Sequence, residues 1–483
     1  MRAVRVCVLI LTLMIIITTT GCWGGRETDE VAYVLAIGFD KGEQDELLVT
    51  VRVANPRAIA GAGAGAGAGG EGGGGGAQST LVLSVESNTP IPTLNLFDIS
   101  VDRQLSLLHT KAYVFSEELA KEGLGRLLLP LNRYRELRGN SLILVTRGKA
   151  RDFIENNKPL LELSPTKQFE LIRELPGTHG LYSITLFQQF YNDIKSLSME
   201  GTIPLVAIRE EGSGTAGTGA RGGGEQILGK YTAGEVPIKG GNRAQIMGNA
   251  VFRRDRMVGE ISGEEARYLL ILQGGFKRGK FSVADPLAAE PMSVALMVIQ
   301  ARGSKIRTTI EPDGSVAVDV DIYLEPEIIG IMSGVNYETE ENKPILEEAI
   351  SREIEQGCRN LIQRTQKEFR SDIVGFGKHL KHHFWTSQPW EEFQWLARYP
   401  EAQVNVTVHT QIRRTGFLLK TTPIRINMKL LLSLVPLAVT YYTFTFGRWA
   451  LRKGLRRGAI GIFMLAAFTL ALVVYALYFK EYF

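Results

Sequence analysis

The spacing of apolar residues changes along the chain and predicts which segments are strands and which are helices. In residues 33–39 and 47–53 every second position is apolar, which is the period of a strand with one buried face. Three short apolar runs predict further strands: 80–86, 111–115 and 141–146. Helices are expected at 93–107 with Thr93 as the cap, at 117–134 with an interruption at Pro130, and from about Lys149. This alternation predicts a mixed α/β region.

The second half of the chain shows longer versions of both patterns. Residues 250–259 predict a hairpin that turns at Arg254-Asp255 and leads into a helix from Ser262. A long helix is expected after Pro344, with an apolar stripe that reaches Phe369 and an end at Gly375 and Gly377. The remaining expected strands are a meander of 294–300, 305–310 and 316–324, the last with clean alternation, and a final strand at 404–412.

The chain ends in two long apolar segments, 426–446 and 459–479, each close to the ~20 residues that a helix needs to cross a bilayer. The loop 447–458 between them is basic, and basic loops stay in the cytoplasm. The loop is therefore predicted to be cytoplasmic, with the preceding domains outside. The predicted fold class is α+β or mixed α/β: a multidomain ectodomain with several mixed sheets flanked by helices, followed by a C-terminal two-helix transmembrane hairpin.

The N-terminus has the pattern of an export signal. Arg2 and Arg5 precede an apolar stretch, 6–17, that is too short to span a bilayer comfortably. Small residues and Cys22 follow, which predicts a lipoprotein: the Cys22 thiol would take a diacylglycerol thioether, and its freed amine a further acyl chain. The usual motif has Leu where this chain has Thr19, and an ordinary signal peptide with an incidental cysteine is the alternative.

The other cysteines and the net charge bear on whether the protein has disulfides and whether it binds nucleic acid. The chain has three cysteines. Cys7 leaves with the signal, and Cys358 has no intramolecular partner if Cys22 carries lipid, so an exported protein without disulfides is predicted. The net charge is only +4 over 483 residues, and no run of basic residues interleaves with aromatic ones. A nucleic-acid partner is therefore not expected.

Two glycine-rich runs cannot pack a core, because they combine high backbone entropy with few apolar side chains. The predicted organisation is a signal peptide at 1–21, an N-terminal α/β domain at 22–208 with a flexible Gly/Ala insertion at 60–77, a Gly-rich linker at 209–227, a C-terminal α/β region at 228–425 whose division near 340 is left open, and the hairpin at 426–483. The insertion contains matches to G-x-G-x-x-G, but no βαβ unit holds them against a helix, so no dinucleotide site is predicted.

A search for reactive groups gives three weak candidates. Residues 274–280 resemble a phosphate-binding loop, but Phe281 stands where Ser or Thr would hold Mg²⁺. The histidines of 379–383 have helical spacing without the Glu or Cys of a zinc motif. Asp319 and Asp321 share one strand face, which is the usual solvated face of a half-exposed strand. The sequence therefore predicts no catalytic residues, no cofactor and no metal site, although groups far apart in sequence escape such a search.

Four stretches, in this order and spacing, resemble a known family. They are Cys22-Trp23 with Arg26-Glu27 and Asp29-Glu30, then Ala36-Ile37-Gly38-Phe39-Asp40; Gly248-Asn249-Ala250-Val251-Phe252 with Asp255, Val258-Gly259 and Glu264-Glu265-Ala266-Arg267; Asp372-Ile373-Val374-Gly375-Phe376-Gly377; and Val404-Asn405-Val406 up to Ile412-Arg413-Arg414-Thr415-Gly416. Together they resemble the Ger(x)C lipoproteins, the C subunits of bacterial spore germinant receptors.

The resemblance implies a non-enzymatic lipoprotein subunit of a nutrient germinant receptor, acting in spore germination with integral-membrane A and B subunits. The ectodomain would lie on the outer face of the cell membrane or inner spore membrane, held by lipid on Cys22 and by the hairpin. Whether this subunit contacts the nutrient is left open. The Gly/Ala insertions and the hairpin depart from the usual pattern. The alternative is a solute-binding lipoprotein of a membrane transporter, which would have two similar lobes joined by a hinge.

Overall fold

The structure, a computed structural model, describes residues 2–18, 30–43, 46–55, 79–162, 166–210, 230–288, 292–416, 421 and 428–478. Cys22, the insertion 60–77 and nearly all of the Gly-rich linker lie outside the described residues. The segment predicted as a signal is a helix, α1 (Arg2–Thr18). The chain divides into two units. The first contains Met1–Ser333 and Tyr337–Leu419, and the second contains Gly334–Asn336 and Lys420–Phe483. The predicted domain boundaries stay predictions.

A nine-stranded mixed sheet forms the larger part of the first unit. Its strands are β1 (Val31–Lys41), β2 (Leu47–Ala54), β3 (Thr80–Ser87), β4 (Gln104–Ser106), β5 (Ala112–Ser116), β6 (Leu142–Thr146), β7 (Thr202–Ile208), β8 (Ala244–Arg253) and β9 (Arg256–Ile261). Their order is β3-β2-β1-β5-β6-β7-β8-β9, with β4 paired to β1. The central strands β1, β5, β6 and β7 are parallel and the outer pairs antiparallel.

Helices cover both faces of this sheet, because successive side chains of a strand point to opposite faces. On β5, Tyr113 and Phe115 belong to one core and Ala112 and Val114 to the other. The first core takes residues from α3 (Leu94–Val101), α4 (Glu117–Glu122), α5 (Gly125–Arg133) and α9 (Phe187–Asp193). The second takes residues from α6 (Ala150–Asn156) and α7 (Lys167–Glu174), which a short helix α8 (Pro176–His179) follows. Burial on both faces is typical of parallel strands.

A four-stranded sheet lies in the C-terminal half of the first unit. Its strands, in spatial order, are β10 (Arg278–Ala284), β11 (Ser293–Ile310), β12 (Val316–Ile331) and β13 (Gln403–Thr410). The predicted alternation on β12 is confirmed, since every second residue from Val316 to Leu324 is buried. The remaining elements are α10 (Gly263–Leu272), α11 (Lys343–Arg364), the π-helical turn η2 (Thr365–Phe369), α12 (Phe376–Leu380), η3 (Lys381–His383), α13 (Ser387–Phe393), α14 (Trp395–Arg398) and η4 (Tyr399–Glu401).

Several helix boundaries differ from the predictions. The helix expected at 93–107 ends at Val101, because Asp102 adopts a left-handed conformation with φ 54° and residues 104–106 pair with β1 instead. Thr93 does not cap it with its side chain, whose hydroxyl bonds the carbonyl of Thr89. The segment 117–134 breaks at Gly123, where φ is 121°, and Pro130 lies inside α5.

Two further predictions concern the second sheet and the helix that follows it. The strands expected at 294–300 and 305–310 are one strand, β11, with irregular pairing around Arg302. The buried stripe of α11 is confirmed at Leu346, Ile350 and Ile354. The helix ends earlier than expected, in η2, and Gly375 begins α12 with φ 87° rather than ending α11.

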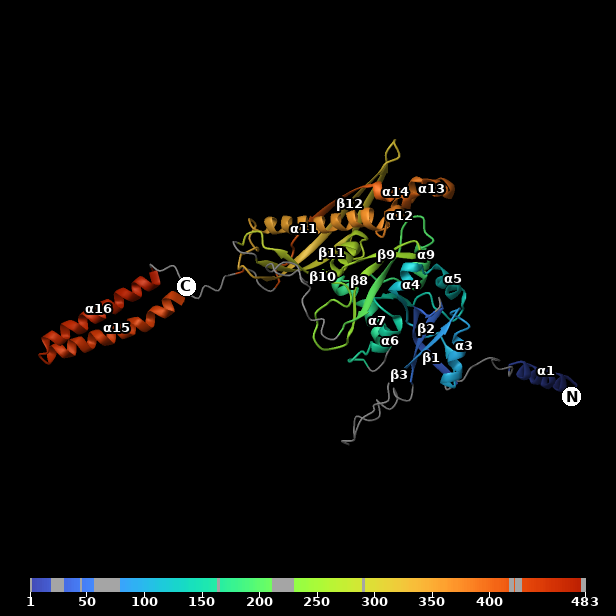
Figure 1. The fold of residues 1–483 in the computed structure, drawn as a ribbon, viewed down its shortest axis with the longest axis horizontal. Helices are drawn as coiled ribbons and strands as arrows, with labels where there is room; N and C mark the ends of the chain where they lie inside the picture. Colours follow the sequence, from blue (N-terminus) through green and yellow to red (C-terminus); the bar gives the residue numbers. More distant parts are fainter. Residues whose placement is uncertain are drawn as a thin grey trace, which may run out of the picture. The chain divides into compact units, whose positions relative to one another are not determined.

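The second unit contains a pair of helices, α15 (Met428–Arg452) and α16 (Arg456–Tyr478), that lie side by side (Figure 1). The rings of Phe444 and Phe463 meet across the pair with centroids 5.3 Å apart. Ala450, Ala459 and Ala466 are buried, so small residues allow the helices to approach closely.

This pair corrects the predicted transmembrane hairpin at 426–483. Within the described part of the chain, no helix combines the length and the apolar character needed to cross a membrane. Spanning takes ~20 consecutive apolar residues, whereas α15 is interrupted by the hydroxyl-bearing residues Thr440–Thr443 and Thr445. The predicted loop 447–458 is shorter than expected, because α15 and α16 leave only a turn at 453–455, where Gly454 has φ 80°. Its predicted cytoplasmic location rested on the hairpin.

Candidate functional site

The motif that ends at Asp40 holds a helix against the central sheet. The Asp40 carboxylate accepts the backbone N–H groups of Ala150 at 2.5 Å and Arg151 at 2.9 Å, at the N-terminus of α6. Burial raises the pKa of Asp40, and these two hydrogen bonds oppose that shift. Gly38 leaves room for the helix, because a Cβ atom there would lie 2.7 Å from Cδ1 of Ile154. The motif therefore has a packing role.

The motif Gly248-Asn249 fastens β8 to the segment before α9. Asn249 is fully buried; its side chain accepts the N–H of Ser183 at 2.9 Å and donates to the carbonyl and the hydroxyl of the same residue. Gly248 has φ 75°, and a Cβ atom there would lie 2.2 Å from the carbonyl oxygen of Ile261. The hydrogen bonds of Asn249 and the lack of room for a Cβ atom at Gly248 are both requirements of the fold.

The motif that begins at Asp372 is built around a fully buried carboxylate. Asp372 accepts the N–H groups of Gly375, Phe376 and Gly377 at 2.8 to 3.2 Å and the indole N–H of Trp395 at 2.8 Å. Burial raises the pKa of Asp372, against the opposing effect of these donors.

Two further acids, Glu200 and Asp193, have raised pKa values. Glu200 is buried and accepts the N–H of Arg254 at 2.6 Å. Burial raises the pKa of Glu200 to about 7, the Arg254 hydrogen bond lowers it, and the charge of Asp372 adds to the rise. Burial also raises the pKa of Asp193 to about 6, with Lys378 opposing. Glu200 thus joins the residues before β7 to the β8–β9 turn.

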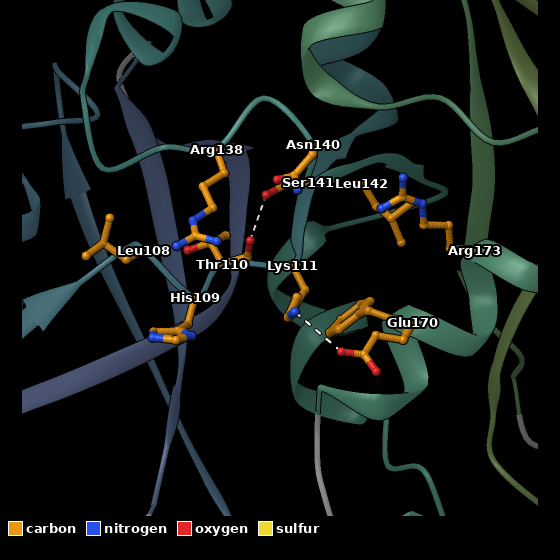
Figure 2. A pocket seen from close by; sticks show the side chains of 11 residues that line it. Leu108, His109, Thr110, Lys111, Arg138, Asn140, Ser141, Leu142, Glu170 and Arg173 are labelled. Atoms are coloured by element: carbon orange, nitrogen blue, oxygen red, sulfur yellow. Dashed lines mark hydrogen bonds and ion pairs between the residues drawn. The ribbon is translucent and has the colours of Figure 1, made fainter. Parts of the chain in front are cut away.

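The motif residues are thus occupied by packing, and the candidate for recognition is a pocket elsewhere (Figure 2). It has a volume of about 100 Å³. Its walls come from three segments: the residues before β5, the residues before β6, and α7. The lining residues are Leu108, His109, Thr110, Lys111, Arg138, Asn140, Ser141, Leu142, Phe169, Glu170 and Arg173. Because β5 and β6 are parallel, the pocket lies at their amino ends.

The base of this pocket is fixed by the sheet. The Ser141 hydroxyl donates to the carbonyl of Thr110 at 2.6 Å, and the N–H of Leu142 donates to the carbonyl of Lys111 at 2.8 Å. The hydroxyl of Tyr113 is buried close by, and burial raises its pKa to about 12, with the Ser141 side chain and the Arg138 backbone opposing the shift. No hydrogen bond of acceptable geometry reaches that hydroxyl from the described residues.

Positive charge dominates the pocket. Lys111 pairs with Glu170 at 3.4 Å, and Glu170 is shared with Lys167 at 3.6 Å. Arg138 and Arg173 are exposed, and neither forms an ion pair with any described residue. Figure 2 shows the two arginines on opposite sides of Lys111. Three cations thus face one carboxylate, which favours an anion.

At the opposite end of the parallel strands, polar side chains are engaged within the protein. Ligands of open α/β sheets usually bind at the carboxyl ends of the strands. Here Asp40, at the end of β1, is used by α6, and Arg147, just after β6, pairs with Glu235 at 2.9 Å and with Glu260. The pocket at the amino ends is the more accessible alternative.

The candidates from sequence are dispersed. Residues 274–277 follow α10 in a turn, and residues 278–280 begin β10. His383 shares a hydrogen bond with Thr308, and Asp321 pairs with Arg307 at 2.8 Å, while Asp319 accepts from Asn405. Among the described residues no cluster of His, Cys, Asp and Glu could hold a metal ion.

The structure also bears on the predicted free cysteine and on the pocket, which the sequence analysis did not predict. The Cys358 thiol is free and fully buried, which raises its pKa, and Cys22 lies outside the described residues. Sequence reasoning missed the pocket, because its three wall segments carry no shared motif. The one available signal was a basic residue at the start of one predicted strand, Lys111, and another shortly before the next, Arg138.

Two family descriptions match the chain. "Spore germination protein N-terminal domain" matches residues 24–208, and "Spore germination B3/ GerAC like, C-terminal" matches residues 247–416. Together they cover most of the described chain and include the motifs around Asp40, Asn249 and Asp372.

Curated relatives match over nearly their whole length. YfkR of Bacillus subtilis (strain 168), named for spore germination, is 25% identical over 85% of this chain and 97% of its own. Spore germination protein KC of the same organism is 24% identical over 88% and 99%, and spore germination protein GerQC of Bacillus cereus is 21% identical over 84% and 98%. A crystal structure of the GerBC protein matches with a TM-score of 0.42 and 14% identity, over 78% of this chain and 96% of that one. The chain belongs to the Ger(x)C family and is a C subunit of a spore germinant receptor.

Proposed function

We propose that this C subunit acts without catalysis, as a binding component that joins integral-membrane A and B subunits in a receptor that a nutrient triggers. The observation that carries the proposal is the pair of family matches over 24–208 and 247–416. The use of Asp40, Asn249 and Asp372 for packing also supports it, because these polar residues of the shared motifs have their hydrogen-bonding groups engaged inside the protein.

The test is a germination assay on spores that lack this chain. Nutrient-triggered germination should be lost on deletion and restored by the wild-type chain. Affinity purification of the restored chain from spore membranes should recover the A and B subunits. Normal nutrient response in the deletion strain, without another C subunit to replace it, would reject the proposal.

We propose further that the chain is held at the membrane by lipid on Cys22. The sequence pattern before Cys22 supports this. A single acyl chain binds a membrane weakly and two or more bind it firmly, so the diacylglyceryl group and a further acyl chain would suffice. Mass spectrometry of the mature N-terminal peptide should show a diacylglyceryl cysteine; an unmodified peptide that begins elsewhere would reject this part.

A solute-binding lipoprotein of a transporter is the weaker candidate. That class has two similar lobes, whereas the two sheets of the first unit differ in strand number and order. Selective loss of uptake of one solute in the deletion strain would favour it.

A further inference from the structure

We propose that the pocket at the amino ends of β5 and β6 binds a small oxyanion, a carboxylate or phosphate group, between Arg138, Arg173 and Lys111. The inference goes beyond the role of the chain in germination and does not depend on it. It rests on the charge, the size and the fixed base of the pocket.

Arg138 and Arg173 form no ion pair with any described residue, so their charges are available to a ligand. An anion placed between them would gain charge-assisted hydrogen bonds, which are shorter and stronger than neutral ones. The planar guanidinium presents several donors in a fixed fork, which fits the oxygens of carboxylate and phosphate. Glu170 does not neutralise the arginines, because its carboxylate is shared by Lys111 and Lys167.

The size of the pocket limits what can enter. Pockets for drug-sized ligands have roughly 300–1,000 Å³, and this one has about 100 Å³. A water molecule takes about 30 Å³ of liquid volume, so the pocket holds one compact group. That group is a free small anion or the charged end of a larger molecule, such as the phosphate of a lipid headgroup.

The base of the pocket fixes the backbone of Lys111, one of the three cations. Lys111 and Ser141 are the residues directly before two buried strands, and backbone hydrogen bonds lock the two segments together. Asn140 adds an amide beside the arginines. Lys111, which also pairs with Glu170, therefore loses less conformational entropy on binding a ligand than a freely moving side chain would.

Calorimetric titration of the purified full-length chain tests the proposal. Inorganic phosphate and acetate are the free-anion probes, and vesicles of phosphatidylcholine with and without phosphatidylglycerol are the lipid probes. The test variant is Arg138→Gln with Arg173→Gln. The control is Arg135→Gln, another exposed arginine, which does not line the pocket. His109 supplies a second readout, because it lines the pocket and is one of only six histidines, so its NMR signals can be assigned.

Saturable, 1:1 binding of a free anion or of anionic vesicles supports the proposal if the double variant weakens it at least tenfold and the control leaves it unchanged. That factor is about what one charge-assisted hydrogen bond contributes. Binding of free phosphate or acetate identifies a soluble ligand, and binding of anionic vesicles alone identifies a headgroup. Shifts of the His109 signals should saturate together with the heat. Wild-type protein that binds neither probe, or a double variant that binds as tightly as wild type, overturns it.

Discussion

The indole N–H of Trp395 donates to the carboxylate of Asp372 at 2.8 Å, deep inside the protein. The same carboxylate accepts three backbone N–H groups from the next turn of chain, so its charge is surrounded by donors. Gly377 is required by this arrangement, since a Cβ atom there would lie 2.3 Å from the Trp395 ring and 2.4 Å from the carbonyl of Ser198. A polar signature of the family is thus explained by folding rather than by chemistry on a ligand.

Replacing Asp372 should therefore reduce stability strongly. Asp372→Ala leaves four buried donors without an acceptor, and such losses cost roughly 3–5 kcal/mol of unfolding free energy. Urea denaturation of the full-length chain measures this. Asp152→Asn, at an exposed position on α6, should change the unfolding free energy by less than ~0.5 kcal/mol. Equal stability of Asp372→Ala and wild type would contradict the packing role.

The buried acids predict that stability falls as the pH rises. The folded pKa values of Glu200, about 7, and Asp193, about 6, are raised by burial above their ordinary values. The folded chain thus binds more protons than the unfolded chain between about pH 4.5 and 7, and its stabilisation is lost as the pH rises through that window. Glu200 alone contributes at most ~3 kcal/mol.

Denaturation midpoints measured from pH 5 to 8 test this slope. The midpoint should decline with rising pH in the wild type, and Glu200→Gln should flatten the decline because the amide does not titrate. Glu174→Gln, at an exposed position at the end of α7, should keep the wild-type slope. A midpoint that rises over this range would show that the desolvation of Glu200 is outweighed by its contacts.

The extent to which sequence predicted this fold depends on the range of the interactions involved. The alternation of β12 and the stripe of α11 were predictable, because each reflects burial of one face of one element. The break was predicted at Pro130 but lies at Gly123. The prediction failed because a proline can remain in a short helix when its neighbours hold the turn. The end of α11 depends on Thr365, whose hydroxyl bonds Ile362 and Tyr399, a contact 34 residues away in sequence. The pocket needed three distant segments, so no local pattern marked it.

Replacing Gly248 should cost stability for two reasons, its left-handed backbone conformation and the close approach of Ile261, and the two contributions can be measured separately. Gly248→Ala must place a Cβ atom 2.2 Å from the carbonyl of Ile261, at φ 75°. Gly240→Ala has nearly the same φ, 77°, with nothing within 4 Å. A left-handed alanine alone costs about 1–2 kcal/mol. Denaturation should show a loss of that size for Gly240→Ala and a clearly larger one for Gly248→Ala; equal losses would mean that β8 moves away from β9 at little cost.

Cys358 provides a probe of opening in the helix that covers β13. Its thiol is fully buried on α11, and burial raises its pKa, so the reactive thiolate is scarce in the folded state. In a chain with Cys7→Ser and Cys22→Ser, thiol reagent should label Cys358 only as fast as the protein unfolds. Labelling should accelerate in urea along the unfolding transition. Arg359→Cys, at a partly exposed position next to it, should label at once under native conditions. Rapid native labelling of Cys358 would show that α11 opens locally without global unfolding.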